Sequence, residues 1–444
     1  MIWIELIILL GCIVIGARLG GIALGAMAGI GLLVFVFLFG LPPGGPPQAV
    51  LGMIIAVITA LATMQAAGGL DYLVSLAEKI MRKKPQYITF VAPIVTYALV
   101  AAAGTTHVIY AVLPVIAEVS RTGNVRPERP LSISVIAGFQ GVTASPISAA
   151  TVAMLGFVLG QGVSLPRLMA ITIPSTFFGV LIGALSVAWR GRNLDADPEY
   201  QKRLATGEVK VPLPSPSFDA KNLFRARGAM VLFLFGIVLV VLIGIFPDLR
   251  PAYEVAAANG VTETDQVSMS MAIMIVMIAI AGLIMLAFKA SPETALKGTI
   301  MRSGITAIIC ILGISWLGSS FFEGNRSSII GGIESVLQAY PWTFAIGLFA
   351  LSAMLFSQAA TVAILMPVGL ALKLPAATLA ALYPAANGIF FLPTYGTLLA
   401  AVSFDQTGTT KIGKYLLNHS FMLPGLVTIV STIVFALLLS RIMG

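Results

Sequence analysis

The chain has 444 residues, of which 58% are hydrophobic and only 10% are charged, whereas a soluble domain carries about 25% charged residues. Apolar runs of about 18 residues or more, the length of a membrane-spanning helix, recur along the whole sequence. This composition excludes a single soluble domain and predicts an all-α polytopic membrane protein.

The net charge of +8 is carried mainly by short loops between apolar segments, where basic residues set the orientation of a membrane protein. Membrane lipid is therefore an expected partner, and nucleic acid is not. With only two cysteines, Cys12 and Cys310, and two histidines, the chain offers neither a disulfide framework nor a structural zinc site. No cofactor or metal is expected.

The apolar pattern predicts ten spanning helices. In chain order they lie at about 2–17, 20–40, 49–70, 131–160, 167–189, 227–246, 267–288, 299–318, 377–403 and 414–440. The segment 2–17 is a spanning helix rather than a cleavable signal, because Glu5 stands where a signal peptide carries basic residues. Gly16, Gly20, Gly25 and Gly29 form a small-residue stripe that predicts close helix packing, with a homodimer face as the alternative.

Two further apolar segments, 86–117 and 341–372, are each interrupted in the middle by small and polar residues. Each is too long for one span and too short for two, so both are predicted to be re-entrant hairpins. With the N-terminus outside, 21 of the 26 Lys and Arg residues then fall in cytoplasmic loops, as the positive-inside rule requires. Both termini are therefore predicted to be periplasmic.

The two halves place their prolines in the same order, at a constant spacing of 247–253 residues. The pairs are Pro114 and Pro367, Pro146 and Pro393, and Pro174 and Pro424. Each half has an odd number of spans, so the second copy is inverted. Inverted repeats with interrupted helices are typical of secondary transporters, which bind substrate near the midplane. Chance alignment of prolines is the alternative.

The predicted organisation follows from this repeat. It comprises an N-terminal repeat (1–190) with the hairpin 86–117 and the broken span 131–160, a cytoplasmic linker (191–226), and a C-terminal inverted repeat (227–444) with the hairpin 341–372 and the broken span 377–403.

Four predicted breaks lie inside apolar segments, at Gly104–His107, Thr143–Ser148, Ser357–Ala360 and Leu392–Gly396. Such breaks persist in hydrocarbon only where they line a cavity or are buried in protein. A helix that begins after a break presents free amides and about half a positive charge. No Lys or Arg lies in the middle of a span, so the pattern favours a small dianion held by helix ends, hydroxyls and amides.

The candidate substrate-binding residues lie at these breaks or beside them. They are Thr105, Thr106, His107, Thr143, Ser145, Pro146, Ser148, Ser357, Gln358, Asn387, Pro393 and Thr394. For any single Ser or Thr, a hydrogen bond to its own helix is the competing interpretation. His107 is the one titratable group near a tip, and a lone histidine is more often a neutral donor than a proton carrier. Intramembrane carboxylates are scarce, so a proton relay lacks its parts.

Several motifs are spread over almost the whole chain. They include AAGGLDYLV, KPQYITFVAPIVTY, RPERPLS, TASPISAA, SQAAT, LPTYGTLLAAV and FDQTGTTKIGKY. Together they resemble the anaerobic C4-dicarboxylate transporter (Dcu) family, most closely its aspartate- and fumarate-handling branch. The resemblance implies exchange of fumarate, malate or aspartate for succinate across the bacterial inner membrane. It also implies kinship with the ion-transporter superfamily, whose members are often dimers that move a transport domain like an elevator.

The resemblance assigns the substrate to eight of the break residues. They are Thr105, Thr106, Ser145, Pro146, Ser357, Gln358, Pro393 and Thr394. Two departures from the family pattern bear on function. Thr106 replaces the second glycine of a Gly-Thr-Gly tip, which alters the backbone there. Leu398 stands where the branch that assists a sensor kinase carries an acidic residue, so a co-sensor role is not expected.

Two other classes of function compete with exchange. A sodium- or proton-coupled dicarboxylate symporter would use the same fold and would need an ion gradient instead of internal substrate. An intramembrane enzyme would need a nucleophile–base pair or a metal-ligand group, and the sequence contains neither pattern.

Overall fold

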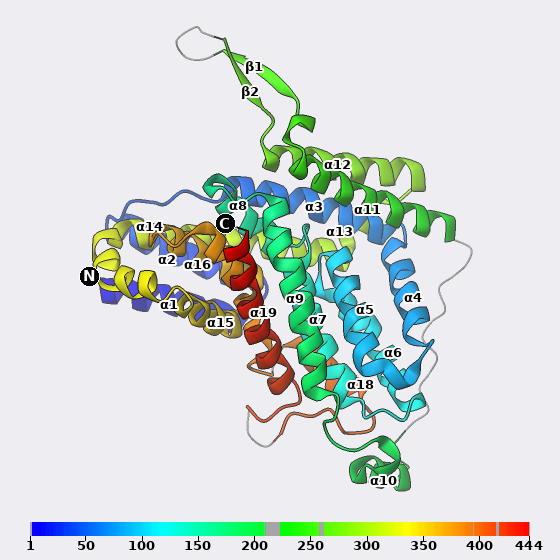
Figure 1. The fold of residues 1–444 in the computed structure, drawn as a ribbon. Helices are drawn as coiled ribbons and strands as arrows, with labels where there is room; N and C mark the ends of the chain where they lie inside the picture. The colour runs from blue at the N-terminus through cyan, green and yellow to red at the C-terminus, as the bar shows by residue number, and fades with distance from the viewer. Residues whose placement is uncertain are drawn as a thin grey trace.

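The computed structural model describes residues 2–207, 209, 223–256, 262–393, 395–413 and 417–443, and most of them are helical (Figure 1). The first half contains α1 (Ile2–Leu19), α2 (Ala23–Leu33), α3 (Gln48–Ala66), α4 (Gly69–Met81), α5 (Ile88–Ala103), α6 (Ile109–Thr122), α7 (Glu128–Ala144), α8 (Ala149–Val158) and α9 (Leu165–Val187). A short helix, α10 (Pro198–Ala205), follows.

The second half contains one β-hairpin among its helices. Its elements are α11 (Leu223–Ile245), β1 (Ala252–Ala256), β2 (Thr262–Gln266), α12 (Met269–Phe288), α13 (Pro292–Lys297), α14 (Thr299–Ala339), α15 (Thr343–Leu355), α16 (Gln358–Ala371), α17 (Ala376–Leu382), a 3-10 helix (Tyr383–Phe390), α18 (Gly396–Phe404) and α19 (Met422–Ile442).

Eight helices in the described part are long and apolar enough to cross a membrane. They are Gln48–Ala66, Pro85–Ala103, Glu128–Gln161, Leu165–Val187, Leu223–Ile245, Met269–Phe288, Thr299–Asn325 and Met422–Ile442. Seven of these match predicted spans, and the eighth is the first arm of the predicted hairpin 86–117. The predicted spans 2–17, 20–40 and 377–403 correspond to shorter apolar helices. The chain is thus a multi-pass membrane protein, and its total of ten spans stays a prediction.

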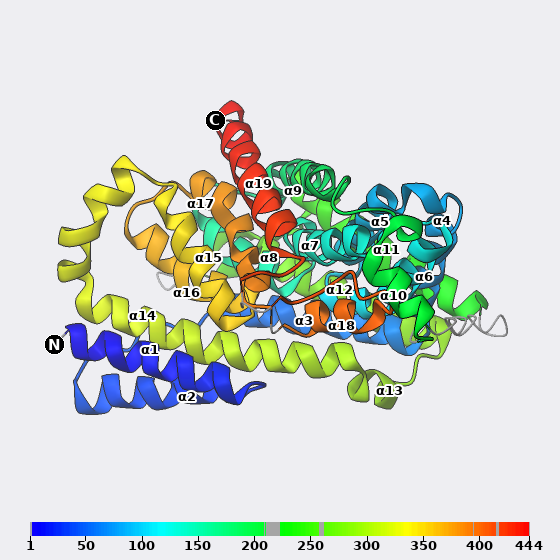
Figure 2. The same ribbon diagram turned by 90° about the horizontal axis from the view of Figure 1, so that it is seen from below.

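The helices form two groups that cross each other. In the first, α3 packs against α12 and α14, α11 packs against α12, and α1 and α2 lie beside α14 (Figure 2). In the second, α7 packs against α5 and α9, and α9 packs against α19. Every residue of α7 is buried, because neighbouring helices surround it on all sides. Figure 1 shows α5, α7, α9 and α19 running across the direction of α3, α11 and α12.

The two halves are interleaved within this arrangement. α6 of the first half packs against α18 of the second, and α16 of the second half packs against α8 of the first. A Cβ on Gly396, the first residue of α18, would lie 2.3 Å from the Tyr110 hydroxyl of α6. A larger residue at this crossing would therefore require the Tyr110 side chain to move.

The glycine stripe of α1 and α2 serves packing inside the chain at two of its four positions. A Cβ on Gly16 would lie 2.7 Å from the backbone of Leu24, and one on Gly25 would lie 2.2 Å from the carbonyl of Ile309 in α14. These contacts are between backbones, as close packing of small residues in membrane helices requires. Gly20 and Gly29 face open space.

Two predicted loops contain regular structure. The first, between the predicted span 49–70 and the predicted hairpin 86–117, contains α4, whose Leu70, Leu73, Ala77 and Met81 are buried on one face. The charged residues of this segment predicted a loop, but they lie on the polar face of an amphipathic helix. The expectation of a wholly helical chain is also wrong, because β1 and β2 pair antiparallel with Ala252 opposite Gln266. Figure 1 shows this β-hairpin projecting at the end of the molecule opposite α10.

Three predicted boundaries also need correction. α14 continues far beyond residue 318, because its polar residues meet a partner: Asn325 donates a hydrogen bond to the buried Glu5 of α1. The predicted linker 191–226 contains α10, and Asp197 caps this helix by accepting from the Tyr200 amide at 3.1 Å. α11 begins at Leu223, before the predicted end of the linker. α19 begins at Met422 rather than at 414; residues 414–416 lie outside the described part.

Candidate functional site

The first hairpin turns at Gly104. α5 ends at Ala103, and Gly104 has φ +67°, a left-handed conformation that glycine adopts without strain. Thr105 is extended, with φ −149° and ψ 142°, and its hydroxyl oxygen accepts from the His107 amide at 3.3 Å. The hydroxyl thus caps the helical turn that leads into α6.

The second hairpin turns in the same way without a glycine. Phe356 has φ +51°, and Ser357 is extended with φ −147° and ψ 113°. The Ser357 hydroxyl oxygen accepts from the Ala360 amide at 3.2 Å and so caps α16. Both tips therefore consist of a left-handed residue followed by an extended Ser or Thr whose hydroxyl caps the next helix.

The breaks at the ends of α7 and of the 3-10 helix accompany these tips. α7 ends at Ala144 and α8 begins at Ala149, with Ser148 capping α8 through the Thr151 amide at 3.1 Å. In the second half the 3-10 helix ends at Phe390 and α18 begins at Gly396. Thr394, a predicted substrate ligand in this break, lies outside the described residues.

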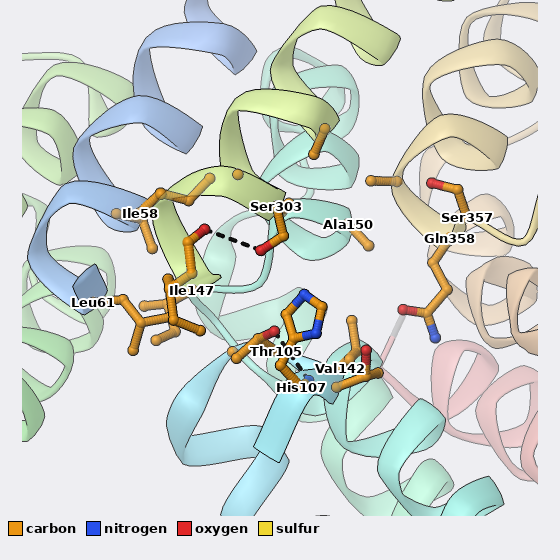
Figure 3. Close-up of a pocket in the computed structure, with 18 of the residues that line it drawn as sticks. Ile58, Leu61, Thr105, His107, Val142, Ile147, Ala150, Ser303, Ser357 and Gln358 are labelled. Atoms are coloured by element: carbon orange, nitrogen blue, oxygen red, sulfur yellow. Dashed lines mark hydrogen bonds between the residues drawn. The ribbon is translucent and has the colours of Figure 1, made fainter. Parts of the chain in front are cut away.

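A cavity of about 170 Å³ lies where the two tips meet α3 and α14 (Figure 3). Thr105, Thr106 and His107 line it from the first tip, and Ser357 and Gln358 line it from the second. Val142, Ile147, Ala149, Ala150, Ile389 and Tyr395 come from the breaks. None of its lining residues in the described part is Lys, Arg, Asp or Glu.

The opposite wall of the cavity is formed by α3 and α14, and it is apolar or small. It consists of Val57, Ile58, Leu61, Ile300, Ser303, Gly304 and Ala307. The Ser303 hydroxyl donates back to the Ile300 carbonyl of its own helix at 3.0 Å. The polar groups that remain for a ligand are thus concentrated on the hairpin tips.

A buried polar network joins the second tip to both halves. The side-chain nitrogen of Gln358 donates to the Phe139 carbonyl of α7 at 3.0 Å and to the side-chain oxygen of Asn387. The Asn387 side-chain nitrogen donates in turn to the Thr143 hydroxyl at 3.0 Å. Thr143 and Asn387 are fully or almost fully buried, so they support Gln358 and do not line the cavity.

The remaining predicted ligands lie behind the cavity surface. Ser145 is buried and its hydroxyl oxygen accepts from the Ile147 amide at 3.4 Å. The Ser148 hydroxyl donates to the Val142 carbonyl at 2.7 Å. Pro146 and Pro393 shape the breaks, and neither lines the cavity. Ser148 thus bonds to a carbonyl of the neighbouring helix, as in the competing interpretation, whereas the Ser145 hydroxyl bonds within the turn between α7 and α8.

Some lining residues were missed by the sequence interpretation. Tyr395 directly follows Pro393 and Thr394, which were predicted ligands, so its position in the same break could have indicated that it lines the cavity. Ser303 and the apolar residues of α3 lie inside ordinary spanning patterns, with no break or proline beside them. Nothing in one sequence marks which face of such a span meets a hairpin tip.

At one end of the molecule, three loops are joined by charged and hydroxyl groups. Arg126 and Arg190 pair with Glu128 at 2.8 and 3.3 Å, and Arg126 also pairs with Asp197. Ser420 donates to Glu128 at 2.8 Å. The network connects the start of α7 with the segment after α9 and with the loop before α19.

Comparisons with known proteins identify the family of the chain. The family model described as anaerobic C4-dicarboxylate membrane transporter matches residues 1–444. The anaerobic C4-dicarboxylate transporter DcuB of Escherichia coli O6:H1 is 41% identical over 99% of both chains. The C4-dicarboxylate transporter DcuA of Wolinella succinogenes is 42% identical over 97% of this chain and 96% of its own. DcuA of Escherichia coli K12 is 41% identical over the full length of both.

Two solved structures share the fold at low sequence identity. The YdaH transporter of Alcanivorax borkumensis has a TM-score of 0.54 at 15% identity and covers 89% of this chain and 85% of its own. MtrF of Neisseria gonorrhoeae, described as an antimetabolite efflux pump, has a TM-score of 0.51 at 12% identity, with 86% and 80% covered. At these identities the likeness concerns the fold alone.

Proposed function

Since the chain belongs to the family of anaerobic C4-dicarboxylate membrane transporters, we propose that it exchanges one C4-dicarboxylate for another across the bacterial inner membrane. Fumarate, malate or aspartate would enter and succinate would leave. The protein is a transporter and not an enzyme, and the proposal adds the mode of transport, its substrates and its direction. The observation that carries it is the cavity in which both hairpin tips present hydroxyl groups.

The chemistry of the cavity favours a small dianion. The Thr105 and Ser357 hydroxyl oxygens accept from backbone amides, which leaves each O–H hydrogen free to donate into the cavity. α16 also begins here, and its first amides and helix dipole favour negative charge. Two such tips, one from each half, suit a ligand with one carboxylate at each end.

The lining residues of the described part include no carboxylate, so a coupled cation would have no acidic side chain to hold it there. Cation-coupled transport uses acidic side chains or backbone carbonyls that hold the ion. Among these lining residues His107 is the one with a titratable group near neutral pH. An exchanger needs no separate ion, because the returning dicarboxylate balances the charge.

The architecture supports an inverted repeat and an elevator-like motion. The two tips share their backbone conformation. In each half the helix after the tip packs against the helix after the break of the other half: α6 against α18, and α16 against α8. The smooth wall of α3 and α14 would be the fixed surface, and the tips with α7, α9 and α19 would be the moving body. α10 and the β-hairpin would mark the cytoplasmic and periplasmic ends, with both chain termini periplasmic.

Counterflow in proteoliposomes tests the proposal. Liposomes loaded with succinate should take up labelled fumarate without an ion gradient, and empty liposomes should not. Lactate and citrate should compete poorly. Lactate has one carboxylate and leaves one tip without a ligand, and the third carboxylate of citrate has no hydrogen-bond donor to meet it. Uptake into empty liposomes that requires a sodium or proton gradient would instead establish a symporter.

A further inference from the structure

Gln358 is held in one orientation by the polar network under the cavity. A glutamine amide has two N–H donors on nitrogen and an acceptor oxygen. The Phe139 carbonyl can only accept, so the Gln358 atom 3.0 Å from it must be the nitrogen. The amide orientation therefore follows from chemistry as well as from the atom positions.

The second N–H of Gln358 is also used. It donates to the side-chain oxygen of Asn387, whose own nitrogen donates to Thr143 at 3.0 Å. Reversing the Gln358 amide would place its oxygen against the Phe139 carbonyl, which cannot donate. Such an acceptor–acceptor contact in a buried site is costly, so the observed orientation is the stable one.

The Gln358 side chain thus offers the cavity an acceptor. Gln358 lines the cavity, and its oxygen lies on the cavity side in Figure 3. Within the described part, no residue donates a hydrogen bond to this oxygen. A carboxylate accepts hydrogen bonds and cannot donate them, so the Gln358 oxygen offers a carboxylate no hydrogen bond.

The acceptor must therefore meet a different part of the substrate. The tip hydroxyls of Thr105 and Ser357 supply donors for the two carboxylates. Resting on the proposed dicarboxylate transport, we propose that Gln358 selects C4-dicarboxylates that carry a hydrogen-bond donor at C2. The donor is the hydroxyl of malate or the ammonium of aspartate, and succinate and fumarate have none.

A ligand series on the wild-type protein tests this without any substitution. Competition against labelled fumarate in succinate-loaded proteoliposomes compares malate with methylsuccinate, whose methyl group has a similar size and donates nothing. Malate should compete about fivefold better and aspartate about tenfold or more, as expected for one neutral and one charged hydrogen bond. Equal competition by malate and methylsuccinate would overturn the proposal while leaving dicarboxylate exchange intact.

The variant Gln358→Met tests the same idea from the side of the protein. It keeps the length of the side chain and removes the amide oxygen, so the preference for malate and aspartate over methylsuccinate should fall to within about twofold, whatever the overall rate of exchange. Thr143→Val is the matched variant: it disturbs the network under Gln358 but keeps the Gln358 oxygen. Thr143→Val should change the competition by all dicarboxylates to the same extent and preserve their order of preference.

The outcomes separate the two levels of the proposal. If Thr143→Val abolishes the preference as fully as Gln358→Met, the selection belongs to the network as a whole and the role of the Gln358 oxygen is refuted. If the wild type exchanges no dicarboxylate, the proposed function itself fails. If Gln358→Met does not insert into the membrane, the wild-type ligand series still decides.

Discussion

The side chains of the tips combine two tasks at the scale of single residues. Thr105 and Ser357 each accept a backbone amide hydrogen through the hydroxyl oxygen, which stabilises the helical turn that follows. The same hydroxyl can donate to a ligand. In the proposed site a structural cap and a substrate ligand are therefore one group, and a substitution affects both roles.

Removing either tip hydroxyl should weaken substrate binding. Each of Thr105→Val and Ser357→Ala deletes one hydrogen bond to a charged oxygen, a loss of about 1.5–3 kcal/mol. The half-saturating dicarboxylate concentration should rise about tenfold or more. The double variant should be non-additive, because both groups hold one ligand. Transport assays in proteoliposomes measure both effects.

A cap away from the cavity provides the control. Ser268 caps α12 by accepting from the Met271 amide at 3.3 Å, and it does not line the cavity. Ser268→Ala should lower thermal stability by about 1 kcal/mol and leave the half-saturating concentration unchanged. If Ser268→Ala weakens transport affinity as much as Thr105→Val, the tip hydroxyls act through helix capping alone.

At the scale of elements, α9 and α19 pack glycine against threonine. A Cβ on Gly179 would lie 1.9 Å from the Thr432 hydroxyl, and one on Gly183 would lie 2.0 Å from the Thr428 hydroxyl. Glycines four residues apart share one helix face, so this crossing depends on both.

Gly183→Val should separate the two helices. The added side chain cannot fit within these distances, so the free energy of unfolding should fall by about 1–3 kcal/mol, which thermal melting in detergent can measure. Gly282→Ala in α12 is the control, since its Cβ meets nothing within 4 Å. It should be neutral or slightly stabilising because alanine favours helix. Equal melting temperatures for Gly183→Val and wild type would contradict the close crossing.

The loop before α19 is organised by one buried carboxylate. Asp405 accepts from the Thr407 amide at 2.9 Å, the Thr410 amide at 2.6 Å and the Thr409 hydroxyl at 2.9 Å. Thr409 also accepts from the Glu128 amide at 3.2 Å, so the loop caps the start of α7.

Asp405→Ala should therefore loosen this loop. Two backbone amides would lose their acceptor, and the free energy of unfolding should fall by at least about 2 kcal/mol. Limited proteolysis should then cut the segment 405–420 sooner than in the wild type. Ser403→Ala, which removes only an exposed hydroxyl bonded to the Ala400 carbonyl, should behave like the wild type. Unchanged proteolysis of Asp405→Ala would show that the loop is held by other contacts.

At the scale of the whole molecule, the proposed topology can be tested by labelling. Cys12 and Cys310 are buried, so new cysteines can be labelled against little background. Lys83→Cys and Thr122→Cys flank the first hairpin and should both react only from the cytoplasm. Tyr340→Cys and Lys373→Cys flank the second and should both react only from outside. Labelling of either pair from opposite sides would rule out that re-entrant hairpin.

The sequence alone determined the membrane class, the family and most of the interrupted segments. Long apolar runs have few alternatives to spanning helices, and the full-length family match confirms the resemblance. The tips were found because Thr105 and Ser357 stand where polar residues interrupt apolar runs. These are local properties of the chain, so one sequence contains them.

Only the tertiary structure decided which groups meet and which of their atoms face the cavity. Ser303 and the residues of α3 carry no local signal, since their place in the wall depends on how distant helices cross. The orientation of the Gln358 side chain is likewise a property of the packed structure. Its amide is oriented by Phe139 and Asn387, which lie far from it in sequence. A sequence shows that a side chain can both donate and accept, and the packed neighbours determine which of the two it offers.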